Sequence, residues 1–323
     1  GVEIRCNQRI GEDISLNDLE KEYDAVFIAV GAYKSRRLNI EGEEAEGCMD
    51  CLSFLRDARM GKDTKLGKKV AIIGGGNAAM DAARTAWRMN PEKVYLIYRR
   101  SKSQMPADIE EIDALMEEGV EIHEQATPIK IHTKDNHVNG IECLKTRLSQ
   151  VDESGRARPV PVEGSNFTLE VDNVLVAISQ EPDIEKLISG TKIDIEKGQT
   201  FVVDQKNLAT KQEGIFAGGD LVRGADTIVA AMGDGKNAAV FIQQYLEKQE
   251  YALDHKWQNV TSGAQATDAT PWEINHKHPK ALDPKQRKNF DEVEAVLDDE
   301  TAKKQAERCL HCDVKCNICV EVC

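Results

Sequence analysis

The chain has 323 residues, enough for two domains of ordinary size and a tail. Its 42 basic and 56 acidic residues give a formal net charge of −14, which argues against a nucleic-acid partner because phosphate binding needs a concentrated positive surface. No apolar run approaches the roughly 18 residues of a membrane span, and the polar first residues do not form a signal peptide. These features predict a cytoplasmic protein that handles small charged cofactors. Because the chain begins with glycine and ends inside a cysteine motif, we expect it to be a piece of a longer polypeptide.

Strand and helix patterns alternate through the first part of the chain. Buried strands are predicted at 24–32, 69–73, 94–98 and 120–124, and helices at 51–59, 74–89 and 107–118. Because strand, helix and strand follow one another at this spacing, we expect a right-handed parallel sheet.

The pattern then changes to short alternating segments between 128 and 169, with turn signals at 135–136 and 154–155. This predicts an antiparallel meander laid across the parallel sheet. Further buried strands are expected at 174–178 and 214–217, followed by a long helix at 227–248.

A glycine-rich motif, Gly74-x-Gly76-x-x-Ala79, follows a predicted strand and opens a helix. The first glycine allows a tight turn, the second lets the backbone approach a pyrophosphate, and the small third residue permits close helix packing. The helix N-terminus adds free N–H groups and a positive dipole. We therefore predict that Gly74, Gly76, Asn77 and Ala78 bind the pyrophosphate of a nicotinamide cofactor. A glycine-rich turn without a ligand is the alternative.

Two arginines, Arg99 and Arg100, end the next predicted strand, where an NAD site places an acidic residue for the ribose 2′-hydroxyl. Guanidinium groups bind a phosphate through parallel charge-assisted hydrogen bonds. The pair therefore favours NADPH over NADH, although two arginines at a strand end can also be simply solvated.

A second strand–turn–helix corner lies at 215–228, where a strand runs into Gly218-Gly219-Asp220. The glycines let a cofactor lie against the backbone, and the Asp220 carboxylate can accept a hydrogen bond from a ribityl hydroxyl. The helix that begins near Thr227 and Ile228 can direct its N-terminus at the pyrimidine end of a flavin and stabilise the reduced form. Gly219, Asp220, Thr227 and Ile228 are the predicted FAD contacts.

Taken together, these motifs resemble the glutamate synthase small-chain family. The matching stretches are 29–32, 70–84, 98–100, 105–107, 178–183 and 216–239. The resemblance implies an α/β, two-dinucleotide-binding-domain flavoprotein fold, with parallel Rossmann-like sheets, an antiparallel meander and a C-terminal iron–sulfur segment. Through the first stretch it also implies that Val30 and Gly31 contact a cofactor.

The chain departs from the family pattern in two places. The family has glycine where Ser179 stands, so we expect a different local turn there. The family's first dinucleotide motif, which grips the ADP half of FAD, would precede residue 1, so we expect this piece alone to bind FAD poorly.

Five cysteines crowd the last fifteen residues: Cys309, Cys312, Cys316, Cys319 and Cys323. The spacing predicts a 4Fe-4S cluster in a reducing compartment, with structural zinc as the rival. The last three match a bacterial ferredoxin run, but Asp313 occupies the position of that run's first cysteine. In these cysteines the chain is most similar to selenate reductase iron–sulfur subunits.

The predicted parts follow from these motifs. They are a partial FAD-binding domain at 1–66, an NADP-binding domain at 67–178, the rest of the FAD-binding domain at 179–252, a linker at 253–290, and an iron–sulfur segment at 291–323 that begins with a helix at 291–306.

We expect an enzyme that serves as the electron-input module of an NADPH-dependent flavin and iron–sulfur oxidoreductase, with an electron-acceptor domain or subunit as its partner. Two alternatives stay open. One is a non-catalytic electron-relay or assembly subunit. The other is a thioredoxin-reductase-like disulfide reductase that uses Cys48 and Cys51, while Cys6 and Cys143 are expected to be ordinary small residues.

Overall fold

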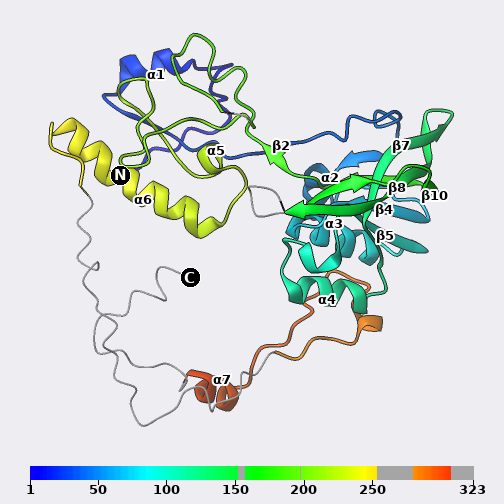
Figure 1. The fold of residues 1–323 in the computed structure, drawn as a ribbon. Coiled ribbons are helices and arrows are strands. Elements are labelled where there is room, and N and C mark those ends of the chain that lie inside the picture. The colour runs from blue at the N-terminus through cyan, green and yellow to red at the C-terminus, as the bar shows by residue number, and fades with distance from the viewer. Residues whose placement is uncertain (152–156, 197, 253–278, 307–323) are drawn as a thin grey trace. The chain divides into compact units, whose positions relative to one another are not determined.

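The computed structural model describes residues 1–151, 157–196, 198–252 and 279–306 (Figure 1). The chain divides into two compact units. The first unit comprises Gly1–Lys34, Gln180–Lys277 and Asp298–Cys323, and the second comprises Ser35–Ser179 and His278–Leu297. The short strands β2 (Lys34–Ser35) and β12 (Gln180–Glu181) pair with each other.

The second unit is built on a five-stranded parallel sheet with strand order β3-β11-β4-β5-β6. The strands are β3 (Cys48–Asp50), β11 (Asn173–Val176), β4 (Lys69–Ile73), β5 (Lys93–Tyr98) and β6 (Glu121–Glu124). The predicted parallel sheet is therefore confirmed, and the predicted strand at 69–73 coincides with β4.

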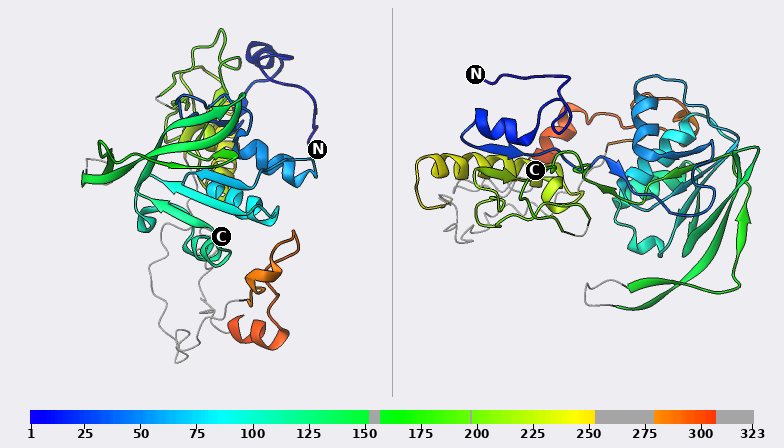
Figure 2. Two further views of the ribbon diagram at one scale, coloured as in Figure 1. Left: turned by 90° about the vertical axis from the view of Figure 1, so that its right-hand side faces the viewer. Right: turned by 90° about the horizontal axis from the view of Figure 1, so that it is seen from above.

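The sheet lies between a layer of helices and an antiparallel meander (Figures 1 and 2). Alternate side chains of its strands face these two layers. On one face Val70, Ile72 and Leu96 pack among three helices, which are α2 (Cys51–Arg59), α3 (Asn77–Arg88) and α4 (Ile109–Glu117). On the other face Ala71 and Ile73 pack against an antiparallel meander. Its strands are β7 (Ala126–Lys134), β8 (His137–Val151), β9 (Ala157–Pro161) and β10 (Phe167–Leu169). The predicted meander is confirmed.

The first unit holds a two-stranded parallel sheet of β1 (Val26–Ile28) and β13 (Ile215–Ala217). The apolar faces of three helices in this unit enclose a core around Phe216 and Phe241. These helices are α1 (Leu16–Glu22), α5 (Asp220–Arg223) and α6 (Ile228–Leu246). The predicted buried strand at 24–32 is shorter than expected. Ala29 and Val30 lie exposed, because within the described residues β13 is the only strand that pairs with β1.

The units divide the chain differently from the predicted boundaries. Residues 35–66 were assigned to the FAD-binding part, but they lie in the second unit, because β3 pairs with β11 at the sheet edge and α2 packs against α3. Within the predicted linker at 253–290, residues 279–290 are described and belong to the second unit. The predicted helix at 291–306 is only α7 (Asp299–Ala306).

Ser179, the residue that replaces a family glycine, has a backbone φ of +131°. L-residues rarely adopt this angle, and such positions cost on the order of 1–3 kcal/mol. We expect Ser179→Gly to raise the free energy of unfolding by about 1 kcal/mol in urea denaturation. Ser189→Gly is the control and should lower it, because Ser189 is not among the residues with positive φ. Equal effects of the two substitutions would contradict the strain at Ser179.

Candidate functional site

Three successive glycines lie between β4 and α3, and each meets a different neighbour. Gly74 has φ +153°, and a Cβ there would lie 2.2 Å from the Ala177 carbonyl oxygen. A Cβ on Gly75 would meet the Tyr98 ring at 2.5 Å. For Gly76 the nearest atom is Pro106 Cγ at 3.9 Å. The fold itself therefore requires the first two glycines, whereas Gly76 leaves open space that a ligand can occupy.

The N-terminus of α3 faces this space without a side-chain cap, because its N-cap residue is Gly76. The N–H groups of Ala79 and Met80 donate to the Gly76 carbonyl, and no acceptor in the described chain is assigned to those of Asn77 and Ala78. Unpaired N–H groups at the end of a twelve-residue helix, together with the helix dipole, suit an anion such as a pyrophosphate.

A loop that follows the short helix η1 (Lys102–Gln104) forms a wall beside the glycines. The Ala107 N–H donates to the Gly75 carbonyl at 3.2 Å, and the Asp108 N–H donates to Asn77 Oδ1 at 3.0 Å. The side-chain oxygen of Asn77 therefore holds this wall in place, which leaves its backbone N–H and the N–H groups of its side chain for a ligand.

Arg99 and Arg100 follow β5, whose end lies beside the glycines because Gly74 N–H donates to the Ile97 carbonyl at 3.0 Å. The Arg100 Nε donates to the Ala157 carbonyl of β9 at 3.2 Å, whereas the Arg99 side chain is exposed and has no partner assigned within the described residues. The two predicted phosphate-binding arginines are thus not equivalent.

The turn after β13 is closely packed in the first unit. A Cβ on Gly218 would meet Phe27 Cζ at 2.9 Å, and Gly219 has φ +66°. Asp220 follows as the first residue of α5 and is half-buried. Within the described residues, the Asp220 carboxylate has no hydrogen-bond partner, so it is available to a ribityl hydroxyl.

Asp234 of α6 fixes the turn at Gly218–Asp220, a role that was not predicted from the sequence. Its buried carboxylate accepts the Gly219 N–H at 2.8 Å and the Arg223 Nε at 2.9 Å. Burial alone would raise the pKa of Asp234, but the hydrogen bonds from Arg223 and Gly219 outweigh it and lower the pKa. A charged residue on the buried stripe of α6, four residues before Ala238, is the sequence signal that reveals it.

The other predicted flavin contacts lie in the first unit as well. Thr227 is the N-cap of α6, and its hydroxyl accepts the Ala230 N–H. Ile228 is 80% exposed, so the first turn of α6 presents an uncovered apolar side chain. Val30 is exposed after β1, and the following Gly31 has φ +73°.

The upstream cysteines are poor nucleophiles. Burial raises the pKa of Cys48 to about 12 and that of Cys51 to about 11, with nearby carboxylates adding to both shifts. Burial likewise raises the pKa of Cys143 to about 12. Thiol–disulfide exchange needs a thiolate, so this pair is unsuited to it near neutral pH. The predicted cluster ligands Cys309, Cys312, Cys316, Cys319 and Cys323 lie outside the described residues.

Within the described ranges, no helix has both the length and the apolar character needed to cross a membrane.

Two strand–turn–helix corners on separate units, the second of which also carries an antiparallel meander, define a two-dinucleotide-binding flavoprotein fold. The same fold occurs in Mycobacterium tuberculosis FprA, solved with NADPH, which superposes with a TM-score of 0.62 at 19% identity over 75% of this chain and 68% of that one. Thioredoxin reductase of T. acidophilum superposes with a TM-score of 0.54 at 21% identity, over 69% of this chain and 66% of the other.

The chain belongs to the pyridine nucleotide-disulphide oxidoreductase family, whose model matches residues 4–235. This is a family of NAD(P)H-dependent flavin oxidoreductases. The chain is 38% identical to the NADPH-Fe(3+) oxidoreductase subunit beta of Geobacter sulfurreducens, over 97% of this chain and 52% of the relative. It is 39% identical to the NADP(+)-dependent formate dehydrogenase subunit beta of Moorella thermoacetica, over 97% and 45%. It is 34% identical to the glutamate synthase [NADPH] small chain of Escherichia coli, over 76% and 56%. The chain thus spans about half the length of these relatives.

Proposed function

We propose that this chain is the electron-input module of an NADPH-dependent flavin and iron–sulfur oxidoreductase. The observation that carries the proposal is the open space at Gly76, which faces the uncapped N-terminus of α3. The chemistry supplied when NADPH and FAD are bound is hydride transfer followed by single-electron steps.

The chain's own residues have distinct tasks in this proposal. The N–H groups of Asn77 and Ala78 bind the pyrophosphate of NADPH, and Arg99 binds the 2′-phosphate. Asp220 accepts a hydrogen bond from the ribityl chain of FAD, and Asp234 keeps the preceding turn in position. The N-terminus of α6 stabilises negative charge on the flavin ring.

The acceptor side of the proposal rests on the cysteine spacing and on the relatives. The five cysteines at 309–323 have the spacing of cluster ligands, so a 4Fe-4S cluster is proposed as the next electron carrier. Two relatives are named as beta subunits of NADPH- or NADP-dependent enzymes, which supports an electron-acceptor domain or subunit as the partner of this chain.

We expect Arg99→Ala to weaken NADPH binding roughly 10- to 100-fold and to leave NADH binding unchanged. The reason is that a charge-assisted hydrogen bond is worth about 1.5–3 kcal/mol and each 1.4 kcal/mol is tenfold in affinity. Calorimetric titration with NADPH and with NADH gives the ratio of the two dissociation constants. Arg100→Ala is the matched control and should change it much less, because Arg100 is bonded to Ala157. If the ratio of the dissociation constants changed in Arg100→Ala and not in Arg99→Ala, Arg100 would be the residue that binds the 2′-phosphate.

The function itself is tested by anaerobic titration of the full-length protein with NADPH. We expect the visible flavin absorption band to bleach as the flavin is reduced. A protein that contains no flavin would instead support the relay or assembly alternative, and one whose flavin does not bleach would refute the proposal.

A further inference from the structure

The second unit contains a segment that the motifs left unexplained, residues 280–297, here called the strap. It folds back on itself, because Leu282 N–H donates to the Val293 carbonyl at 2.8 Å and Ala295 N–H donates to the Lys280 carbonyl at 2.9 Å. At its tip, Asp283 caps the short helix η3 (Pro284–Gln286). The next residue is Arg287, whose Nε donates to the Leu282 carbonyl at 2.6 Å. The strap thus presents one arginine in a fixed direction.

Arg287 is the one buried residue of the strap, with only 4% of its side chain exposed. The apolar side chains of the strap contribute little to its docking, since Phe290 and Val296 point largely into solvent. The usual hydrophobic stabilisation of a packed segment is therefore small here. The attachment depends on polar contacts.

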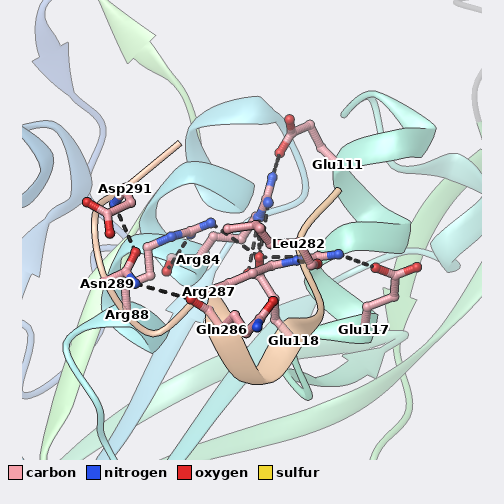
Figure 3. A network of polar contacts seen from close by, with 10 residues as sticks. All are labelled: Arg84, Arg88, Glu111, Glu117, Glu118, Leu282, Gln286, Arg287, Asn289 and Asp291. Atoms are coloured by element: carbon pink, nitrogen blue, oxygen red, sulfur yellow. Dashed lines mark hydrogen bonds and ion pairs between the residues drawn. The ribbon is translucent and has the colours of Figure 1, made fainter. Parts of the chain in front are cut away.

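The site that receives Arg287, here called the ionic seat, lies on α3 and along α4 and its C-cap, and consists of Arg84, Arg88, Glu111, Glu117 and Glu118 (Figure 3). Glu118 is fully buried at its centre. Arg84 lies 3.0 Å and Arg88 3.2 Å from Glu118 Oε1. Arg287 places Nη2 3.0 Å from Glu117 and Nη1 3.7 Å from Glu118.

The charges of the seat balance with or without the strap. Without Arg287, Arg84 and Arg88 face Glu118 and Glu111, and Glu117 is 57% exposed and can be solvated. With Arg287, a third guanidinium joins and Glu117 provides its counter-charge. No buried charge is stranded in either case, so the second unit can remain folded when the strap leaves.

A second contact lies beside the seat at the end of α3. The ammonium of Lys288 sits over the Trp87 ring, 5.2 Å from its centroid, and donates to Asn90 Oδ1 at 2.9 Å. Lys288 is exposed, so this contact adds less than the buried arginine does.

We propose that the strap is a releasable anchor, with Arg287 as its latch, that attaches the chain leading to the C-terminal cysteines to the unit that carries α3. The cysteine segment begins a dozen residues after Leu297. The chain that leads to this segment is therefore held on the strap as far as Ala295, in the unit that carries α3. The anchor requires neither nucleotide nor cluster, so it stands apart from the proposed function.

Hydrogen exchange of the whole chain, followed by mass spectrometry, tests the latch. We expect Arg287→Ala to speed exchange in peptides of 280–297 at least about tenfold, because hydrogen bonds to charged groups are lost. Exchange in β4 and α3 should not change. Lys285→Ala, an exposed cation on the same short helix, is the control and should behave like the parent protein.

Two results would overturn the anchor. Unchanged strap exchange in the Arg287→Ala protein would show that Arg287 does not hold the strap. Equal acceleration in β4 would show that Arg287 belongs to the core of the unit and is not a releasable latch.

Discussion

Gly76→Ala is expected to weaken NADPH binding by about 10- to 100-fold while the protein stays folded. Nothing in the chain fills the space of the added methyl group, whose nearest neighbour is Pro106 at 3.9 Å. The methyl group would instead occupy the place proposed for the pyrophosphate, and overpacking costs about 1–3 kcal/mol. Titration with NADPH, together with urea denaturation, measures both properties.

Gly74, two residues before Gly76, is the control, because its substitution should affect stability. Gly74→Ala places Cβ 2.2 Å from the Ala177 carbonyl oxygen at a φ of +153°, so we expect it to destabilise the fold by about 3 kcal/mol or more. Gly76→Ala should change the free energy of unfolding by no more than about 1 kcal/mol, since it replaces only an N-cap residue. If Gly76→Ala left NADPH affinity unchanged, the nucleotide would not lie at this helix end.

Glu118→Ala is expected to lower the free energy of unfolding of the second unit by about 3–5 kcal/mol. The substitution removes the carboxylate that Arg84, Arg88 and Arg287 share in the ionic seat (Figure 3). Burial lowers the pKa of Arg88, with the Glu118 charge acting against it, so the arginines depend on this carboxylate. Urea denaturation followed by circular dichroism gives the free energy.

Glu117→Ala is the matched control, because Glu117 lies next in the chain but is 57% exposed. We expect it to cost less than about 1 kcal/mol, the usual value of an exposed ion pair. Glu118→Gln should fall between the two, since the amide keeps one acceptor oxygen but lacks the charge. Equal effects of Glu117→Ala and Glu118→Ala would contradict a central role for Glu118.

Local patterns predicted the elements of the second unit well. The predicted helix at 51–59 coincides with α2, because Asp50 caps it and Cys51 and Phe54 supply a short apolar stripe. The predicted turn at Asp135 and Asn136 is confirmed, since both residues adopt positive φ between β7 and β8. These features depend on neighbours in the chain, which a sequence pattern can reveal.

Features that depend on distant neighbours escaped prediction. Residues 35–66 lie in the second unit because the pairing of β3 with β11 joins segments more than a hundred residues apart, and no local pattern indicates such a pairing. Arg99 and Arg100 look alike in the sequence, yet only Arg100 is bonded to Ala157. The strap was divided between the predicted linker and the predicted helix at 291–306, since its polar sequence gives no sign of the buried contact that Arg287 makes.

By itself, the sequence determined the order of the main strands and helices of the second unit, the glycine-led corner at Gly74–Gly76 and the corner at Gly218–Asp220. Those signals are local, because tight turns and open helix ends require particular residues at particular spacings. Only the tertiary structure decided which glycine leaves space for a ligand, which arginine is free, and how Asp234 and Arg287 are used. Each of these depends on atoms brought together from distant parts of the chain. A charge that is buried there must keep its hydrogen-bond and ion-pair partners, which fixes the position of its side chain.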